Sequence, residues 1–196
     1  MSGDTRVKLS LRKTVALVAF LNLAYFGVEF AVARVIGSVS LFADSVDFLE
    51  DASINLLILL ALGWSVKNRA RLGTALAFIL LIPGAATLWT AWTNFLDPVV
   101  PSPFLMTATG SGALIVNLFC AFLLAAFRSH SGSLTKAAFL YARNDALANV
   151  GIICAGLLTA LLASAWPDLI IGLAIAAMNA DAAKDVFTAA RKEAKL

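Results

Sequence analysis

Charged residues are scarce in this sequence of 196 residues, because Asp, Glu, Lys and Arg together make up only 14% of it. Hydrophobic residues account for 61%, whereas soluble domains have about 45–50% apolar and about 25% charged residues. This composition excludes an ordinary soluble domain and indicates an integral membrane protein. The net charge of +3 does not indicate nucleic-acid binding, because the basic residues lie at the ends of apolar stretches.

Cysteine and histidine are also nearly absent. Cys120 and Cys154 fall in apolar segments without C-x-x-C spacing, which favours inert small hydrophobes over disulfides or a metal cluster. The single histidine, His130, is expected to be a solvated loop residue. No phosphate-binding loop, nucleophile elbow or dinucleotide-binding fingerprint occurs, so the chain is expected not to be an enzyme and to carry no prosthetic group.

Six apolar stretches are long enough to cross a bilayer, which takes ~20 residues each. We therefore predict an all-α, polytopic membrane protein, a six-transmembrane-helix bundle in which residues 1–196 form a single transmembrane domain. The short connections leave no room for a folded soluble domain. The predicted spans run over about 14–36, 40–66, 73–96, 103–127, 136–164 and 167–190.

The positions of Lys and Arg predict the orientation, because cytoplasmic loops collect positive charge. The N-terminal tail, the second and fourth connections and the C-terminal end carry nearly all of it. Both termini are therefore expected to be cytoplasmic, in a protein of the cell (inner) membrane. The basic residues concerned are Arg6, Lys8, Arg12, Lys13, Lys67, Arg69, Arg71, Arg128, Lys136, Lys184, Arg191, Lys192 and Lys195.

Four acidic residues interrupt the second apolar stretch, although an ionised carboxylate at the bilayer centre costs at least ~2.5–3.5 kcal/mol. Asp44, Asp47 and Asp51 follow the spacing i, i+3, i+7 and so share one helical face. Glu50 lies at the edge of that face. A lipid-facing helix would not carry such a face, so a cation or protons inside the protein must compensate it.

The fifth apolar stretch carries a second polar face, formed by Tyr141, Asp145 and Asn149 at spacing i, i+4, i+8. At 1.5 Å per residue, Asp51 lies roughly 16 Å from the outer surface and Asp145 roughly 14 Å from the inner surface. Both depths reach the midplane of a hydrocarbon core about 30 Å thick. The antiparallel spans therefore bring Asp47, Asp51 and Asp145 to one level, where alternating-access transporters hold their substrate.

Clustered carboxylates in a low dielectric repel one another, so some are expected to hold protons while the site is empty. A divalent cation would displace those protons, which predicts metal/proton antiport. Two alternatives stay open: a site for protons or an organic cation, and structural pairing with Arg34 or Arg143. An organic-cation site would need aromatic side chains facing the acids for cation–π contact, and no clear stripe of aromatic residues adjoins Asp47 or Asp51.

The two acidic segments resemble the signatures of the cation diffusion facilitator family. In segment 37–51, Asp47 and Asp51 match the family's His/Asp-x-x-x-Asp pair. In segment 141–151, Asp145 matches the Asp of the His-x-x-x-Asp pair. The resemblance covers essentially the whole chain and implies a six-helix bundle in which spans one, two, four and five surround the transport site.

The resemblance also implies a function: efflux of zinc, manganese, iron, cobalt or cadmium in exchange for protons, usually by a homodimer. It implies that Asp47, Asp51 and Asp145 are direct metal ligands. Glu29 fits a further family position, where proton coupling is one expected role and structural hydrogen bonding the other.

One departure from the family pattern concerns the ligands. Tyr141 stands where the family usually has His, and a neutral Tyr is a poor ligand. We therefore expect three carboxylates with Tyr141, Asp44 and Asn149 as auxiliary groups, Asp44 lying one turn further out in an outward vestibule. Because nearly all of these donors are oxygens, we expect manganese or ferrous iron to be favoured relative to zinc.

A second departure concerns the family's cytoplasmic C-terminal domain, which is expected to be absent. A homodimer would then form through the transmembrane helices, for example at small residues of the sixth span. A non-transporting membrane partner of an active transporter stays open as an alternative to transport.

Overall fold

The computed structural model describes residues 2–61, 82, 84–125 and 132–193, and the side chains of 11–60, 82, 84–125 and 145–179. These ranges are helical apart from short connections, so the all-α prediction is confirmed for the described part of the chain. A helical segment at 84–96 accompanies the labelled helices. They are α1 (Ser2–Ile36), α2 (Val39–Ala61), α4 (Pro103–Ala125), α5 (Gly132–Leu162) and α6 (Trp166–Glu193).

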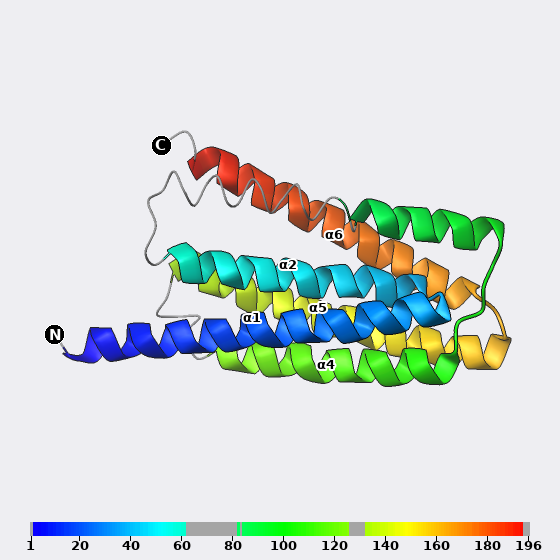
Figure 1. Cartoon of the computed structure of the whole chain (residues 1–196), viewed down its shortest axis with the longest axis horizontal. Helices are drawn as coiled ribbons and strands as arrows, with labels where there is room; N and C mark the ends of the chain where they lie inside the picture. The colour runs from blue at the N-terminus through cyan, green and yellow to red at the C-terminus, as the bar shows by residue number, and fades with distance from the viewer. Residues whose placement is uncertain (1, 62–81, 83, 126–131, 194–196) are drawn as a thin grey trace.

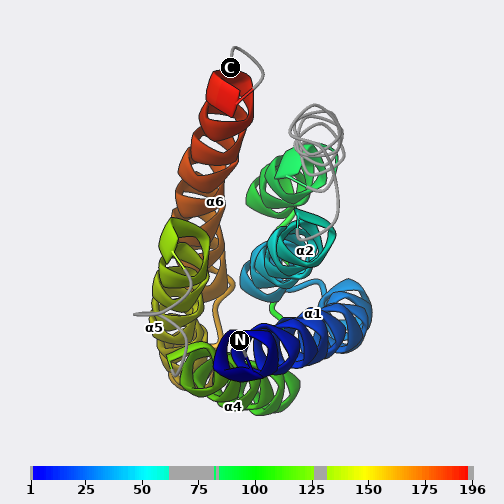
Figure 2. The ribbon, with the colours of Figure 1, turned by 90° about the vertical axis from the view of Figure 1, so that its left-hand side faces the viewer.

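The helices lie side by side along one long axis, and the start of α1 and the end of α6 lie at the same end of the bundle (Figure 1). Seen end-on, α6, α5, α4 and α1 follow one another around a curve (Figure 2). Helix α2 contacts α1, α5 and α6, and α4 contacts α1 and α5. The acidic second span is therefore surrounded by other helices.

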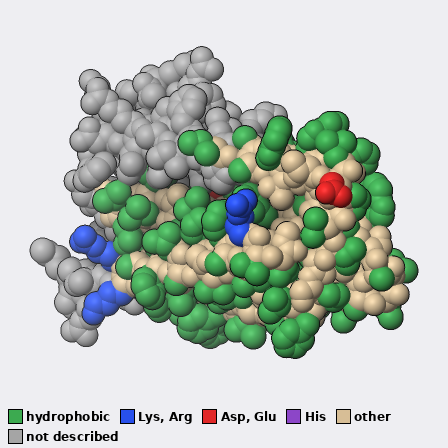
Figure 3. Space-filling view, turned by 45° about the vertical axis from the view of Figure 1, so that its right-hand side comes forward, with side chains coloured by type: hydrophobic (Ala, Val, Ile, Leu, Met, Phe, Trp, Pro, Cys, Tyr) green, Lys and Arg blue, Asp and Glu red, His purple; other side chains and the backbone are tan. Residues whose placement is uncertain are grey.

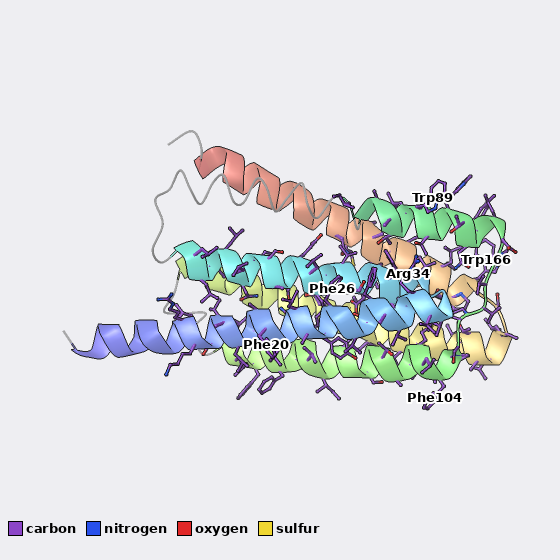
Figure 4. The ribbon with its side chains drawn as sticks, viewed as in Figure 1. Phe20, Phe26, Arg34, Trp89, Phe104 and Trp166 are labelled. Atoms are coloured by element: carbon purple, nitrogen blue, oxygen red, sulfur yellow. The ribbon has the colours of Figure 1, made fainter. Side chains whose placement is uncertain are left out.

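Three helices of the described part are long and apolar enough to cross a membrane: Leu11–Ile36, Pro103–Ala125 and Asp145–Leu162. Hydrophobic side chains are spread over the described part of the face shown in Figure 3, and few charged side chains appear on it. Phe20 and Phe104 project away from the bundle, and their side chains are 66% and 78% exposed (Figure 4). Such a surface suits lipid, which confirms an integral membrane protein.

Helix α1 begins well before the predicted span, at Ser2 instead of residue 14. No proline precedes Pro83, and Arg6 and Lys8 are compatible with helix, so nothing in the sequence ends the helix at the apolar boundary. Hydropathy therefore marked the apolar part of a longer helix. The predicted basic connection at 67–72 lies outside the described residues, as do residues 128–131 of the predicted connection at 128–135.

Small residues allow α4 and α5 to approach closely. A Cβ atom added at Gly110 would lie 2.9 Å from Cγ2 of Ile152, which is shorter than ordinary packing allows. Ile152 belongs to a buried cluster that also contains Met106 of α4 and Leu41 and Phe42 of α2. The α4–α5 contact thus supports the face of α5 that meets α2.

Replacing Gly110 with valine is expected to destabilise the protein by about 1–3 kcal/mol, because the added methyl groups overpack the α4–α5 contact. Thermal unfolding of the detergent-solubilised protein measures the effect. Gly27→Val is the matched control, since a Cβ at Gly27 meets nothing within 4 Å. Equal melting temperatures for the two variants would contradict this account of the α4–α5 contact.

Candidate functional site

The acidic residues of α2 point into the bundle. Asp44, Asp51 and Glu50 are 0%, 6% and 8% exposed, and Asp47 is partly buried. They are enclosed because α2 is packed on three sides by α1, α5 and α6. The structure corrects one expectation, because Asp44 is fully enclosed instead of lying in an outward vestibule. Glu50, at the edge of the acidic face, is buried with the others.

Asp145 of α5 joins this cluster, as its depth along the helix predicted. Its carboxyl group lies within electrostatic range of Asp47 and Asp51, and it approaches Asp51 closely enough for a hydrogen bond. The structure therefore places these three carboxyl groups within electrostatic range of one another, from two antiparallel helices. Among the residues described, however, no three His, Cys, Asp or Glu side chains have the spacing of an assembled metal site.

A polar chain from α4 through α1 orients Asp51. The amide Nδ2 of Asn22 donates to Oδ2 of Asp51 at 3.3 Å, and the Cys120 thiol donates to Oδ1 of Asn22 at 3.6 Å. Asn22 and Cys120 are fully buried. Asn22 could be found from the sequence as a lone amide in an apolar span, but Cys120, expected to be an inert hydrophobe, carried no signal for this contact.

Helices α2 and α5 share a local sequence arrangement, Asp-x-x-x-Asn. Nδ2 of Asn55 donates to the backbone carbonyl of Asp51 at 2.8 Å, and Nδ2 of Asn149 donates to that of Asp145 at 2.7 Å. The Oδ1 atom of each Asn is buried and has no hydrogen-bond partner among the described residues. Asn55 joins the predicted Asn149 as a source of amide oxygen, and its spacing of four from Asp51 was the signal.

A second acid pair lies between α1 and α2. Glu29 is fully buried and interacts electrostatically with Asp44. No donor from another described residue reaches any of the four carboxylate oxygens, so the two carboxyl groups have only each other as hydrogen-bond partners. The nearby Tyr25 hydroxyl donates instead to the carbonyl of Thr109, at 2.6 Å. Arg34 is exposed on α1, so the alternative of structural pairing with it is wrong for these two acids.

Three residues considered from the sequence cannot be placed in this site. Tyr141 lies on α5 one turn before Asp145, but its side chain falls outside the described residues, as does that of Arg143. His130 also lies outside them.

A family model described as the cation efflux transmembrane domain matches residues 15–192 of the chain. The matched range includes every candidate residue from Glu29 to Asn149. No match is found among curated proteins.

Glu29→Gln is expected to raise the thermal stability of the empty protein by about 1–3 kcal/mol. The amide supplies a permanent donor to Asp44 and removes one of two buried carboxyl groups that have no donor besides each other. Asp97→Asn is the control, because it makes the same acid-to-amide change at an exposed position. A Glu29→Gln protein that melts at or below the wild-type temperature would contradict the description of this pair.

Proposed function

This chain belongs to the cation efflux family, and from that premise we propose that it exports a divalent metal ion in exchange for protons. Family membership makes the chain a membrane cation transporter and not an enzyme. The observation that carries the finer proposal is the meeting of Asp47 and Asp51 of α2 with Asp145 of α5 inside the bundle.

The proposed ligands are these three carboxylates, and their mutual repulsion is what a divalent ion would relieve. Asn22 holds Asp51 in place, and the free Oδ1 atoms of Asn55 and Asn149 are the nearest additional oxygen donors on the two ligand helices. Because the carboxylates are neighbours without forming a closed cage, ion binding would draw α2 and α5 together. Movement of that kind is the basis of alternating access about a midplane site.

Protons enter the proposal through the same electrostatics. Three carboxylates and one divalent ion leave an unbalanced negative charge, and an empty site leaves three. Protons that neutralise the empty site would be released as the ion binds, which couples the two fluxes. The buried Glu29–Asp44 pair lies outside the proposed ligand set, so we assign proton coupling to Glu29, with Asp44 as its auxiliary partner.

The oxygen-rich donor set bears on which metal is carried. Carboxylate and amide oxygens suit manganese and ferrous iron, whereas imidazole suits zinc. With Tyr141 in place of the usual His, we rank manganese and iron above zinc, cobalt and cadmium. Tyr141 would act through its hydroxyl as an auxiliary group, not as a direct ligand.

The direction of export rests on the orientation of the bundle. The start of α1 and the end of α6 lie at one end of the structure, and the basic residues of the sequence gather at that end of the predicted spans (Figure 1). We propose that this end is cytoplasmic and that the protein resides in the inner membrane. Any homodimer would assemble through the lipid-facing helices.

The organic-cation alternative receives less support from the aromatic residues. Tyr25 and Phe48 lie beside the acids, but their ring centroids are only 5.0 Å apart, so the two rings pack against each other. The Tyr25 hydroxyl is also bound to the Thr109 carbonyl. Neither ring is thereby arranged as an open face for a bulky cation.

Replacing Asp51 with asparagine is expected to reduce metal-driven proton flux by about 100-fold or more. Loss of a partner that merely orients a metal ligand already costs 10–100-fold, and Asp51 is proposed as a ligand itself. Flux is measured in proteoliposomes containing a pH-sensitive dye, with manganese, ferrous iron, zinc, cobalt and cadmium tested in turn.

Ser53→Ala is the control on the same helix, because it removes only a bond from the Ser53 hydroxyl to the Leu49 carbonyl. Wild-type flux in Asp51→Asn would refute the ligand assignment. Wild-type liposomes that carry no metal but do carry an organic cation would favour the rival function, and inactivity towards both would favour a non-transporting partner.

Tyr141→His is expected to raise the preference for zinc over manganese by on the order of tenfold, equivalent to about 1.4 kcal/mol. The substitution adds an imidazole nitrogen one helical turn from Asp145, and imidazole binds zinc well. Competition between the two metals in the liposome assay measures the ratio. Tyr141→Phe is the control, because it removes the hydroxyl without adding a nitrogen ligand, and an unchanged ratio in Tyr141→His would refute a role in selectivity.

A further inference from the structure

The outer end of α2 has all of its first backbone donors satisfied, and a residue of another helix satisfies two of them. Ser38 precedes the helix, and its hydroxyl accepts the N–H of Leu41 at 3.2 Å, as an N-cap residue does. The N–H groups of Val39 and Ser40 donate to Asp168, at 2.7 and 3.1 Å. The first turn of a helix leaves such groups without partners of its own.

The carboxylate of Asp168 forms all four of its described hydrogen bonds with residues at this end of α2. Its side chain is 1% exposed, and it also accepts the hydroxyls of Ser38 and Ser40, at 2.7 and 2.5 Å. Four donors therefore compensate its buried carboxylate. Asp168 lies in the first turn of α6 as well, so the positive ends of two helices meet at one carboxylate.

The backbone of α6 is held against the same turn of α2 further along its length. A Cβ atom at Gly172, one turn after Asp168, would lie 2.8 Å from the backbone nitrogen of Ser40. Two turns later, Nδ2 of Asn179 donates to the carbonyl of Ala43 at 3.2 Å. Ala43 is followed directly by the acidic Asp44, so α6 is joined to α2 up to the edge of the acidic face.

Bonds of this kind fix a helix along its own axis. The N–H groups of a first turn point along that axis, so a carboxylate that accepts two of them opposes sliding. A slide by one residue amounts to 1.5 Å and would break both bonds. Asp47 and Asp51 lie further along the same helix, so their depth follows the depth of its first turn.

We propose that Asp168 is a positioning residue, which fixes the axial position of α2 and thereby places Asp47 and Asp51 level with Asp145. The consequence for metal affinity rests on the proposed function, whereas the consequence for the position of α2 does not. Asp168 touches no proposed ligand and is not itself a ligand.

The position of α2 is tested by spin-label distances in the full chain. Labels are placed at Leu56→Cys on α2 and Leu157→Cys on α5, both exposed positions, with the exposed Cys154 replaced by serine. Asp168→Ala is expected to shift or broaden the distance distribution by at least about 1.5 Å, the rise of one helical residue. Hydrogen exchange at residues 39–41 is expected to accelerate at least about tenfold as the first turn loses its partners.

The transport arm separates positioning from general destabilisation. In proteoliposomes, Asp168→Ala is expected to raise the KM for the transported metal by about tenfold and to leave kcat within about twofold, because misplaced ligands lose affinity. Asp168→Asn keeps one carbonyl-type acceptor and should recover part of both effects. Asp97→Ala is the control, because it removes an exposed acid near the same end of the bundle.

Every outcome of these measurements bears on the inference. Unchanged label distances in Asp168→Ala would overturn it, as would a lower melting temperature with an unchanged KM. If Asp168→Ala does not fold, Gly172→Ala tests the same contact, because its added methyl group moves α6 and the Asp168 carboxylate away from the first turn of α2 without removing the acid. Unchanged label distances in Gly172→Ala would then overturn the inference. A wild-type protein that moves no metal would refute the proposed function, while the label distances would still decide the role of Asp168.

Discussion

Burying carboxylates within a bundle that is apolar on the outside is the constraint on which the rest of this structure depends. Each ionised acid away from water needs donors, a cation or a proton. This requirement explains why α2 lies against three other helices and why lone polar residues of the neighbouring helices face it. Asn22 of α1 reaches Asp51, and the Cys120 thiol of α4 supports Asn22. An apolar helix in the place of α2 would need none of these partners.

The buried acids divide into two kinds according to their donors. Asp168 accepts four hydrogen bonds from the first turn of α2 and its preceding serine, so its charge is balanced permanently by the fold. Glu29 and Asp44 have no donor among the described residues other than each other. A carboxylate of the first kind has a structural role, because protein donors already occupy the oxygens that a ligand would bind. A carboxylate of the second kind needs a proton or a cation to balance its charge. This difference separates Asp168, which positions a helix, from the candidates for ion and proton coupling.

Helical periodicity predicted the central part of the candidate site. The spacing of Asp44, Asp47 and Asp51 placed them on one face, and counting 1.5 Å per residue placed Asp145 at their level. These steps succeeded because both depend only on regular helix geometry. The pairing of Glu29 with Asp44 and the enclosure of Asp44 depend on how α1 packs on α2, which periodicity does not specify. The role of Asp168 could not be predicted, because an acid directly after Trp166-Pro167 is typical of the first turn of its own helix. No local sequence pattern indicates that this side chain caps a different helix, α2.

The division between fixed and uncompensated acids also bears on how a transport cycle would use this bundle. Helix α2 is bound at its N-terminal end to α6 by the hydrogen bonds to Asp168, whereas Asp145 reaches the acidic face from α5 and approaches Asp51. Under the proposed function, α2 then serves as the fixed half of the site and α5 as the half whose approach completes it. One divalent ion balances two of the three carboxylates, so the third charge must be met by the Asn22 amide or by a retained proton. The pKa of the carboxyl group that carries this third charge depends on how closely α5 approaches α2. The number of protons exchanged is therefore coupled to the closure of the site.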